Sequence, residues 1–151
     1  MLRRSVTLLP AFLVALLSAC GGGAPASNGT VTFDASDTKA YAGVGAGEVV
    51  HFTGTEPFWG GQVSGNSLTY STPENRKGAT IVVWRFAGRN GVSFSGDFDG
   101  MPFVMAITPG NCSDGMSDRS YPFAATLQVK GTQRDGCAWT DKQPFTGSKR
   151  P

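Results

Sequence analysis

The chain has 151 residues, of which 13 are Lys or Arg and 11 are Asp or Glu, and 40% are hydrophobic. Arg3 and Arg4 lie in the first 19 residues, which contain no acidic residue, so the remaining chain carries 11 bases and 11 acids. It has no block of like charge, and nucleic acids and anionic membrane surfaces attract clusters of Lys and Arg. We therefore expect no nucleic-acid partner, and one domain large enough to bury a single core.

Residues 1–19 have the composition of a signal peptide, with a basic start and an apolar run too short to span a membrane as a mature helix. Leu17-Ser-Ala-Cys20 resembles the lipobox of bacterial lipoproteins. The resemblance implies that Cys20 carries lipid and anchors the chain to a membrane without crossing it. Gly21 is not the aspartate that retains many such proteins at the inner membrane, which favours the outer membrane, facing the periplasm. In the alternative, an ordinary signal peptide, Cys20 is incidental.

Residues 20–46 are predicted to be the lipid-anchored cysteine and a flexible tether. Residues 21–29 are Gly, Ala, Ser, Pro and Asn, a composition that buries too little apolar surface to fold. A short strand at Val31–Phe33 is an alternative for part of this segment. We expect the folded domain to cover residues 47–142 and a frayed tail to follow over residues 143–151.

The clearest strand signal is Val92–Phe98, where apolar residues alternate with polar ones. Asn90-Gly91 precedes this run and Asp99-Gly100 follows it, and both pairs are typical of tight type I′ hairpin turns. Residues 80–107 are therefore predicted to form a three-stranded antiparallel meander.

Further strands are expected over residues 48–53, 58–63, 67–71, 123–130 and 137–140, and no helical periodicity follows the signal segment. Seven or eight short strands in a chain with 21 glycines predict an all-β fold. We expect a small single-domain antiparallel β-barrel of about eight strands in meander order, with a β-sandwich as the alternative. A closed barrel would leave no exposed sheet edge.

Two cysteines remain once Cys20 is assigned to lipid. In an oxidising compartment Cys112 and Cys137 are expected to form a disulfide. Closing a loop of this length would stabilise the fold by roughly 3 kcal/mol. The roles of nucleophile or metal ligand for Cys112 are less favoured, since the chain has neither a CxxC pair nor a zinc-type set.

The run Gly54-Thr-Glu-Pro-Phe-Trp59 places a carboxylate next to two large aromatic side chains. In a functional interpretation Glu56 lies at a ligand mouth with Phe58 or Trp59 as its wall. In the structural interpretation, which we favour, Trp59 fills one end of the barrel. Glu56 then accepts backbone hydrogen bonds or pairs with an arginine such as Arg85 or Arg119.

The run Asn111–Phe123 is the densest polar stretch of the chain. Its Ser and Asp residues suit turns in which short side chains bond nearby backbone, and Met116 is expected to pack inward beneath them. A calcium site at Asp114 and Asp118 is the less favoured alternative, because no further carboxylate is near in sequence. The candidate binding surface predicted from the two runs comprises Glu56, Phe58, Trp59, Asp114, Met116, Asp118, Arg119 and Tyr121.

Two other patterns are set aside. Asp97-Phe-Asp-Gly100 resembles a fragment of a calcium loop, but the twelfth position holds Thr108 instead of a glutamate. His51 is the single histidine and has no recognisable nucleophile, so it is given no catalytic role. We predict no catalytic residue, no metal site and no cofactor.

Several motifs together resemble a family of small Gram-negative envelope lipoproteins catalogued as uncharacterised membrane proteins. They are Gly54–Trp59, Leu68–Glu74, the Cys112-Ser-Asp-Gly-Met-Ser-Asp-Arg-Ser-Tyr-Pro122 run and Gly136-Cys-Ala138, in an order and spacing that match over about residues 47–140. The resemblance implies a cell-envelope address and a β-rich fold, and it implies no activity.

The layout of a signal, one small barrel and one disulfide is also distantly similar to periplasmic inhibitors of c-type lysozyme. Thr126–Gly131 lacks the residues that flank the inhibitory motif of those proteins. If the similarity held, Lys130 or Arg134 would face the catalytic carboxylates of a hydrolase.

These observations favour a non-enzymatic outer-membrane lipoprotein that binds an envelope protein or a small envelope ligand. The alternative is an inhibitor of a lysozyme-like cell-wall hydrolase. A third hypothesis, an enzyme, would pair Glu56 with Asp114 or Asp118 across one cleft.

Overall fold

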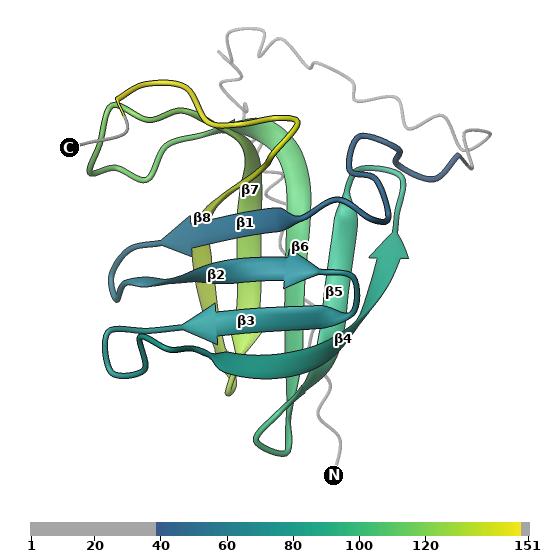
Figure 1. The fold of residues 1–151 in the computed structure, drawn as a ribbon, viewed down its shortest axis with the longest axis vertical. Helices are drawn as coiled ribbons and strands as arrows, with labels where there is room; N and C mark the ends of the chain where they lie inside the picture. The colour runs from purple at the N-terminus through teal and green to yellow at the C-terminus, as the bar shows by residue number, and fades with distance from the viewer. Residues whose placement is uncertain (1–38, 149–151) are drawn as a thin grey trace, which may run out of the picture. The chain divides into compact units, whose positions relative to one another are not determined.

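The computed structural model describes residues 39–148, so Cys20 and the possible strand at Val31–Phe33 lie outside the described residues. Each strand pairs antiparallel with the next, and β8 also pairs with β1, which closes the sheet into a barrel (Figure 1). The predicted barrel is confirmed, and the sandwich alternative is wrong. The strands are β1 (Val50–Gly54), β2 (Trp59–Ser64), β3 (Ser67–Ser71), β4 (Ala79–Ala87), β5 (Val92–Phe98), β6 (Met101–Cys112), β7 (Tyr121–Val129) and β8 (Thr132–Thr140).

Alternation of side chains builds the core inside the barrel. On β7 every second residue from Tyr121 to Val129 is buried, and the residues between them lie on the outer side. Phe52, Leu68, Phe103 and Leu127 are among the fully buried side chains that meet in the interior. Burial of each such side chain contributes about 1.5–3 kcal/mol, so the interior supplies most of the driving force for folding.

The predicted meander is confirmed, but only one of its two turns has the expected form. Asp99 and Gly100 both have positive φ, 55° and 78°, as a type I′ turn requires. At the other turn Gly91 has a positive φ, whereas Asn90 does not. The connection there is longer, because Gly88 N–H bonds to Gly91 O at 3.0 Å and the strands end at Ala87 and Val92.

Strand β8 begins five positions before the predicted Cys137. Lys130 and Gly131, with φ of 48° and 75°, form a tight turn that sends the chain directly from β7 into β8. The first half of β8 is polar and contains Arg134 at a position opposite the fully buried Leu127. This inward-facing arginine breaks the alternation that would have revealed the strand.

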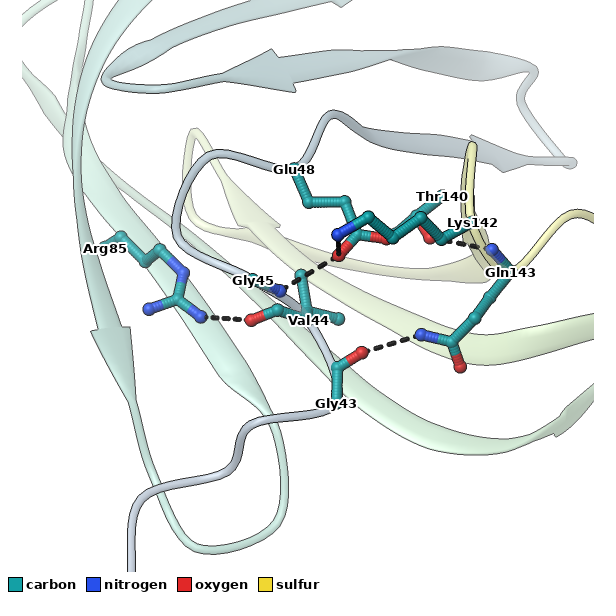
Figure 2. A network of polar contacts seen from close by, with 8 residues as sticks. All are labelled: Gly43, Val44, Gly45, Glu48, Arg85, Thr140, Lys142 and Gln143. Atoms are coloured by element: carbon teal, nitrogen blue, oxygen red, sulfur yellow. Dashed lines mark hydrogen bonds and ion pairs between the residues drawn. The ribbon is translucent and has the colours of Figure 1, made fainter.

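The end of the barrel where β8 stops and β1 begins is closed by the two flanking segments. Val44 is buried, and its carbonyl accepts a 2.6 Å hydrogen bond from Arg85 Nη2 (Figure 2). Gln143 Nε2 donates to Gly43 O at 2.6 Å, which joins the segment before β1 to the segment after β8.

Glu48 stands at the centre of this closure. Its Oε2 accepts the Gly45 N–H at 3.0 Å and lies 3.9 Å from Lys142 Nζ. The Thr140 hydroxyl and the Gly45 N–H hold the pKa of the Glu48 carboxyl below its ordinary value. Since these bonds all favour the ionised form, the carboxylate fixes the turn that leads into β1.

The packed part of the chain therefore extends beyond the predicted limits of 47 and 142. Tyr41 N–H bonds to Gly88 O at 2.7 Å, so contacts with the barrel begin within the segment predicted as tether. Thr146 and Ser120 exchange two backbone hydrogen bonds of 2.9 and 3.1 Å. Residues 143–146 are thus held against the barrel, in contrast to the frayed tail expected there.

The predicted disulfide joins Cys112 at the end of β6 to Cys137 on β8, with 5.7 Å between the Cα atoms. Cys137 is buried, and it pairs in register with Thr53 of β1. The disulfide therefore holds the β6–β7 loop against the strands that close the barrel.

We expect Cys112→Ser to lower the free energy of unfolding by about 3 kcal/mol, because the bond closes a loop of 25 residues in the unfolded chain. Chemical denaturation of the oxidised full chain would measure the loss. Reduced wild type should match the variant, and Cys112→Ser with Cys137→Ser should lose no more than the single change. Equal stability of oxidised and reduced wild type would contradict this role.

Candidate functional site

The Gly54–Trp59 run is divided between structure and surface. Trp59 is buried and packs on Phe52, with 5.7 Å between the ring centroids. Its indole lies across Gly54 and Gly136: a Cβ atom at either glycine would come within 3 Å of the ring. Trp59 thus fills the barrel interior where β1 meets β8, as the structural interpretation expects.

Glu56 and Phe58 of the same run are exposed. The arginines suggested as partners for Glu56 form other contacts: Arg85 Nη2 donates to Val44 O at 2.6 Å, and Arg119 Nε donates to Ser148 O at 2.9 Å. A shallow hollow beside Phe58 and Trp59 is shared with Pro73 and Arg76 of the β3–β4 loop. The predicted wall around Glu56 therefore does not form.

The polar loop between β6 and β7 is organised by one carboxylate, that of Asp114. Oδ1 accepts the N–H groups of Met116 at 3.0 Å and Ser117 at 2.8 Å, and Oδ2 accepts the hydroxyls of Ser117 at 2.8 Å and Tyr121 at 3.0 Å. Burial acts to raise the pKa of Asp114, but these hydrogen bonds outweigh it and lower the pKa to about 2. A carboxylate that is ionised and bonded in this way is poorly suited to act as a general acid or base.

The other predicted loop residues take separate positions. Met116 is 61% exposed, so the expectation that it packs inward is wrong. Its N–H is bonded to Asp114, and the resulting turn directs the thioether outward. The Arg119 guanidinium lies 4.8 Å from the centre of the Phe145 ring, Tyr121 is buried, and Asp118 is exposed.

The structure brings the two runs together through one contact, from Thr55 Oγ1 to Asp114 O at 3.4 Å. Of the eight residues predicted to form a binding surface, half are held in structural contacts: Trp59, Asp114, Arg119 and Tyr121. The exposed half is Glu56, Phe58, Met116 and Asp118. The two runs therefore stabilise the barrel around the β1–β2 and β6–β7 connections and do not build a pocket together.

His51, which was given no catalytic role, belongs to an aromatic cluster outside the core. Its ring stacks on Trp139 at 5.3 Å, and its Nε2 lies 3.2 Å from Asp141 Oδ1. Phe145 contacts Trp139 and Tyr121 at 5.5 and 5.4 Å. The cluster holds the segment after β8 against the barrel wall.

A cavity of about 390 Å³ lies at the barrel mouth, where β3, β5 and β7 end. It is framed by the β5–β6 and β7–β8 turns, which lie at the lower side of Figure 1, and by the β3–β4 loop, which lies at the left of that view. Its wall combines apolar and polar side chains, among them Tyr70, Phe98, Val129, Lys130, Thr132 and Arg134. The volume is within the range of small-molecule pockets.

The polar groups of this cavity are of two kinds. At the rim, Lys130 Nζ pairs with Asp99 Oδ2 at 2.7 Å and lies 4.7 Å from the centre of the Phe98 ring. Inside, Arg134 Nε and Nη1 and the Tyr70 hydroxyl are buried and have no partner at normal hydrogen-bond geometry within the described residues, although the guanidinium lies close enough to the phenol oxygen to interact with it. Burial raises the pKa of the Tyr70 phenol, and the nearby Arg134 guanidinium offsets part of this rise.

Sequence reasoning did not identify this cavity. It named Lys130 and Arg134 only as contacts for a hydrolase, because an arginine in a polar run gives no sign that it faces inward. The register of β8 against β7 supplies that information, by placing Arg134 opposite Leu127.

Within residues 39–148 no group of three or more His, Cys, Asp or Glu side chains is placed to hold a metal ion. The same range has no helix with the length and apolar character needed to cross a membrane. No family model, curated protein or solved structure matches the chain.

We expect Asp114→Asn to lower the free energy of unfolding by about 1–2 kcal/mol at pH 7, after allowance for solvent screening. The pKa is lowered from 3.8 to about 2 in the folded state, so the ionised group stabilises the fold above about pH 4. This contribution is lost as the pH falls towards 2, where variant and wild type should converge.

Denaturant titrations across this pH range would measure the difference. Asp118→Asn is the matched control, because Asp118 is exposed on the same loop and should change stability by less than about 0.5 kcal/mol. A difference between wild type and Asp114→Asn that persists unchanged at pH 2 would contradict the assigned role.

Proposed function

We propose that the protein is a non-enzymatic lipoprotein of the cell envelope whose barrel binds a small ligand in the cavity at its mouth. The observation that carries the proposal is this cavity of about 390 Å³, whose wall combines apolar side chains with buried donors that have no acceptor at normal hydrogen-bond geometry. Binding sites for small molecules combine these two properties. A ligand that enters from solvent would cover Phe98 and Val129 and reach Arg134 and Tyr70.

The proposed address rests on the sequence before residue 39. The signal segment and the lipobox ending at Cys20 support anchoring by lipid, and Gly21 supports the outer membrane, facing the periplasm.

The outer face of β4 fits this address. Val82, Trp84 and Phe86 form a row of side chains that are 60%, 69% and 68% exposed. Exposed Trp and Phe are favoured at the boundary between lipid headgroups and acyl chains. The chain reaches the barrel beside this row, since Tyr41 bonds Gly88 just after β4. We assign the row to contact with the membrane that holds the lipid.

This contact can be tested with the full lipidated chain in vesicles of phosphatidylethanolamine and phosphatidylglycerol that contain a brominated phospholipid. Bromine quenches indole fluorescence at short range, and Trp84 is the exposed tryptophan of the described residues, while Trp59 and Trp139 are at least half-buried. We expect quenching in wild type that Trp84→Phe abolishes.

A double change, Val82→Thr with Phe86→Thr, should reduce the quenching at least twofold. Phe58→Thr removes an exposed aromatic side chain from another part of the surface and should leave it unchanged. Equal quenching in wild type and Trp84→Phe would show that β4 does not touch lipid.

The alternative of a hydrolase inhibitor is less well supported. An inhibitor of that kind needs a protruding cation that reaches into the cleft of the enzyme. Here Lys130 is paired with Asp99, and the Arg134 side chain is directed into the barrel. The same two residues are better placed to meet a small molecule that enters the mouth.

Ligand binding can be tested by calorimetry with the full chain in nanodiscs, using 2-naphthoate and its neutral analogue 2-naphthamide. We expect at least one of them to bind in a saturable manner. Thr132→Trp should weaken that binding at least tenfold, because Thr132 lies in the cavity wall and the larger side chain would fill the mouth.

Gln133→Trp adds the same side chain at the neighbouring exposed position, outside the cavity wall, and should bind as wild type does. If neither compound binds, or if both variants bind equally well, the proposed function is overturned.

A further inference from the structure

We propose that the cavity at the barrel mouth is a site for an organic anion, in which Arg134 and Tyr70 bind a carboxylate and Phe98 and Val129 cover an apolar body. The inference rests on the proposed binding function and adds the chemical class of the ligand. It is carried by buried donors that have no acceptor in the described residues.

The first step is the position of Arg134. It pairs with Leu127, whose side chain is fully buried, so it occupies an inward-facing place on β8. Its Nε and Nη1 atoms are buried without a hydrogen-bond acceptor, and together they carry most of the N–H donors of the guanidinium. A buried charge without a partner is costly, and the usual compensation is an anion bonded to it.

Arg85 is the other inward-bonding arginine, and it lies in different surroundings. Its Nη2 donates to Val44 O at 2.6 Å, under the segment that closes the opposite end. No comparable cover lies over Arg134, which lines the cavity instead. Arg85 Nε is also buried without a hydrogen-bond partner, but it lies beneath this cover, whereas the Arg134 donors line a cavity that a ligand can enter.

The second donor is the Tyr70 hydroxyl. Tyr70 lies inside the barrel, edge-on to Phe98 and Phe103 with centroids 6.0 and 6.2 Å away. Its oxygen is buried, interacts with the nearby Arg134 guanidinium and has no partner at normal hydrogen-bond geometry, and Tyr70 lines the same cavity as Arg134. A guanidinium and a phenol that meet at the inner end of one cavity can both donate to one carboxylate.

The acidic groups around the mouth do not satisfy Arg134. Asp99 is paired with Lys130 at the rim. Glu74 of the β3–β4 loop is exposed and lies within electrostatic reach of Arg134 and Tyr70. It therefore competes with an incoming anion from a distance, and its removal should favour the ligand.

The rest of the cavity wall determines what kind of group the ligand carries besides its carboxylate. Phe98 and Val129 contribute apolar surface, and Lys130 lies over the Phe98 ring. An apolar or aromatic body fits between these side chains while its carboxylate points inward. A free phosphate or a simple sugar would use the donors and leave the apolar wall in water, so an amphipathic acid fits best.

The test compares 2-naphthoate with 2-naphthamide, which have the same ring and differ in charge, by calorimetry with the full chain in nanodiscs. Wild type should bind the acid at least tenfold more tightly than the amide. Arg134→Gln should bring the two affinities within about threefold of each other, and Glu74→Gln should increase the preference for the acid.

Folding is checked by thermal melting of each variant without ligand. Arg134→Met should melt no lower than wild type, because it removes a cation whose buried Nε and Nη1 have no hydrogen-bond partner. If Arg134 stabilised the fold, the variant would melt at a lower temperature. Glu74→Gln keeps Arg134 in place and so tests the electrostatics if Arg134 variants fail to fold.

The outcomes separate the two proposals. If acid and amide bind equally and Arg134→Gln changes neither, the cavity binds ligands without the anion site, and this inference is overturned while the proposed function stands. If neither compound binds wild type, both are overturned. Binding of inorganic phosphate as tight as that of 2-naphthoate would show that the apolar wall plays no part, and would contradict the inference of an amphipathic acid.

Discussion

The pairing of β1 with β8 is the constraint on which the rest of the structure depends. It joins the first and last strands over five positions, from Val50 opposite Thr140 to Gly54 opposite Gly136. Without it the sheet would have two free edges, each presenting unpaired N–H and C=O groups. The two glycines at the end of this pairing leave the space that the Trp59 indole fills. This pairing, the β1–β8 seam, is therefore held by backbone hydrogen bonds between the strands and by the Trp59 indole packed on its inner side.

One end of the barrel is covered by the chain, and the other has an open cavity. At one end Val44 and the network around Glu48 cover the interior, and the segments before β1 and after β8 are tied to each other. At the other end Trp59 fills the side near β1, and a cavity remains beside β3, β5 and β7. The Arg134 guanidinium, whose Nε and Nη1 are buried without a hydrogen-bond partner, lies at this open end. A group of this kind in a protein interior costs stability.

The sequence predicted the architecture well where patterns were local. Alternation and the Asp99-Gly100 turn predicted the central meander, and the expectation of an oxidising compartment for two remaining cysteines predicted the disulfide. Prediction failed where the pairing of distant strands determines which side chains face inward. The strand β8 was predicted to begin at Cys137 instead of Thr132, because Arg134 occupies an inward-facing position where alternation predicts an apolar residue. The candidate site was missed for the same reason. The polar runs were chosen as candidates for their composition, but both carboxylate oxygens of Asp114 already accept hydrogen bonds from Met116, Ser117 and Tyr121.

The meander order has a consequence for how the chain is assembled. Every hairpin from β1–β2 to β7–β8 joins neighbours in sequence, so each can form as soon as its two strands are available. The β1–β8 seam alone needs both ends of the domain, and its last partner, Thr140, is made after all the other strands. During synthesis, β1 therefore stays unpaired on one side until the final strand is complete. A chain truncated before β8 would thus retain most of its hairpins and still present open edges, which favour pairing with other chains.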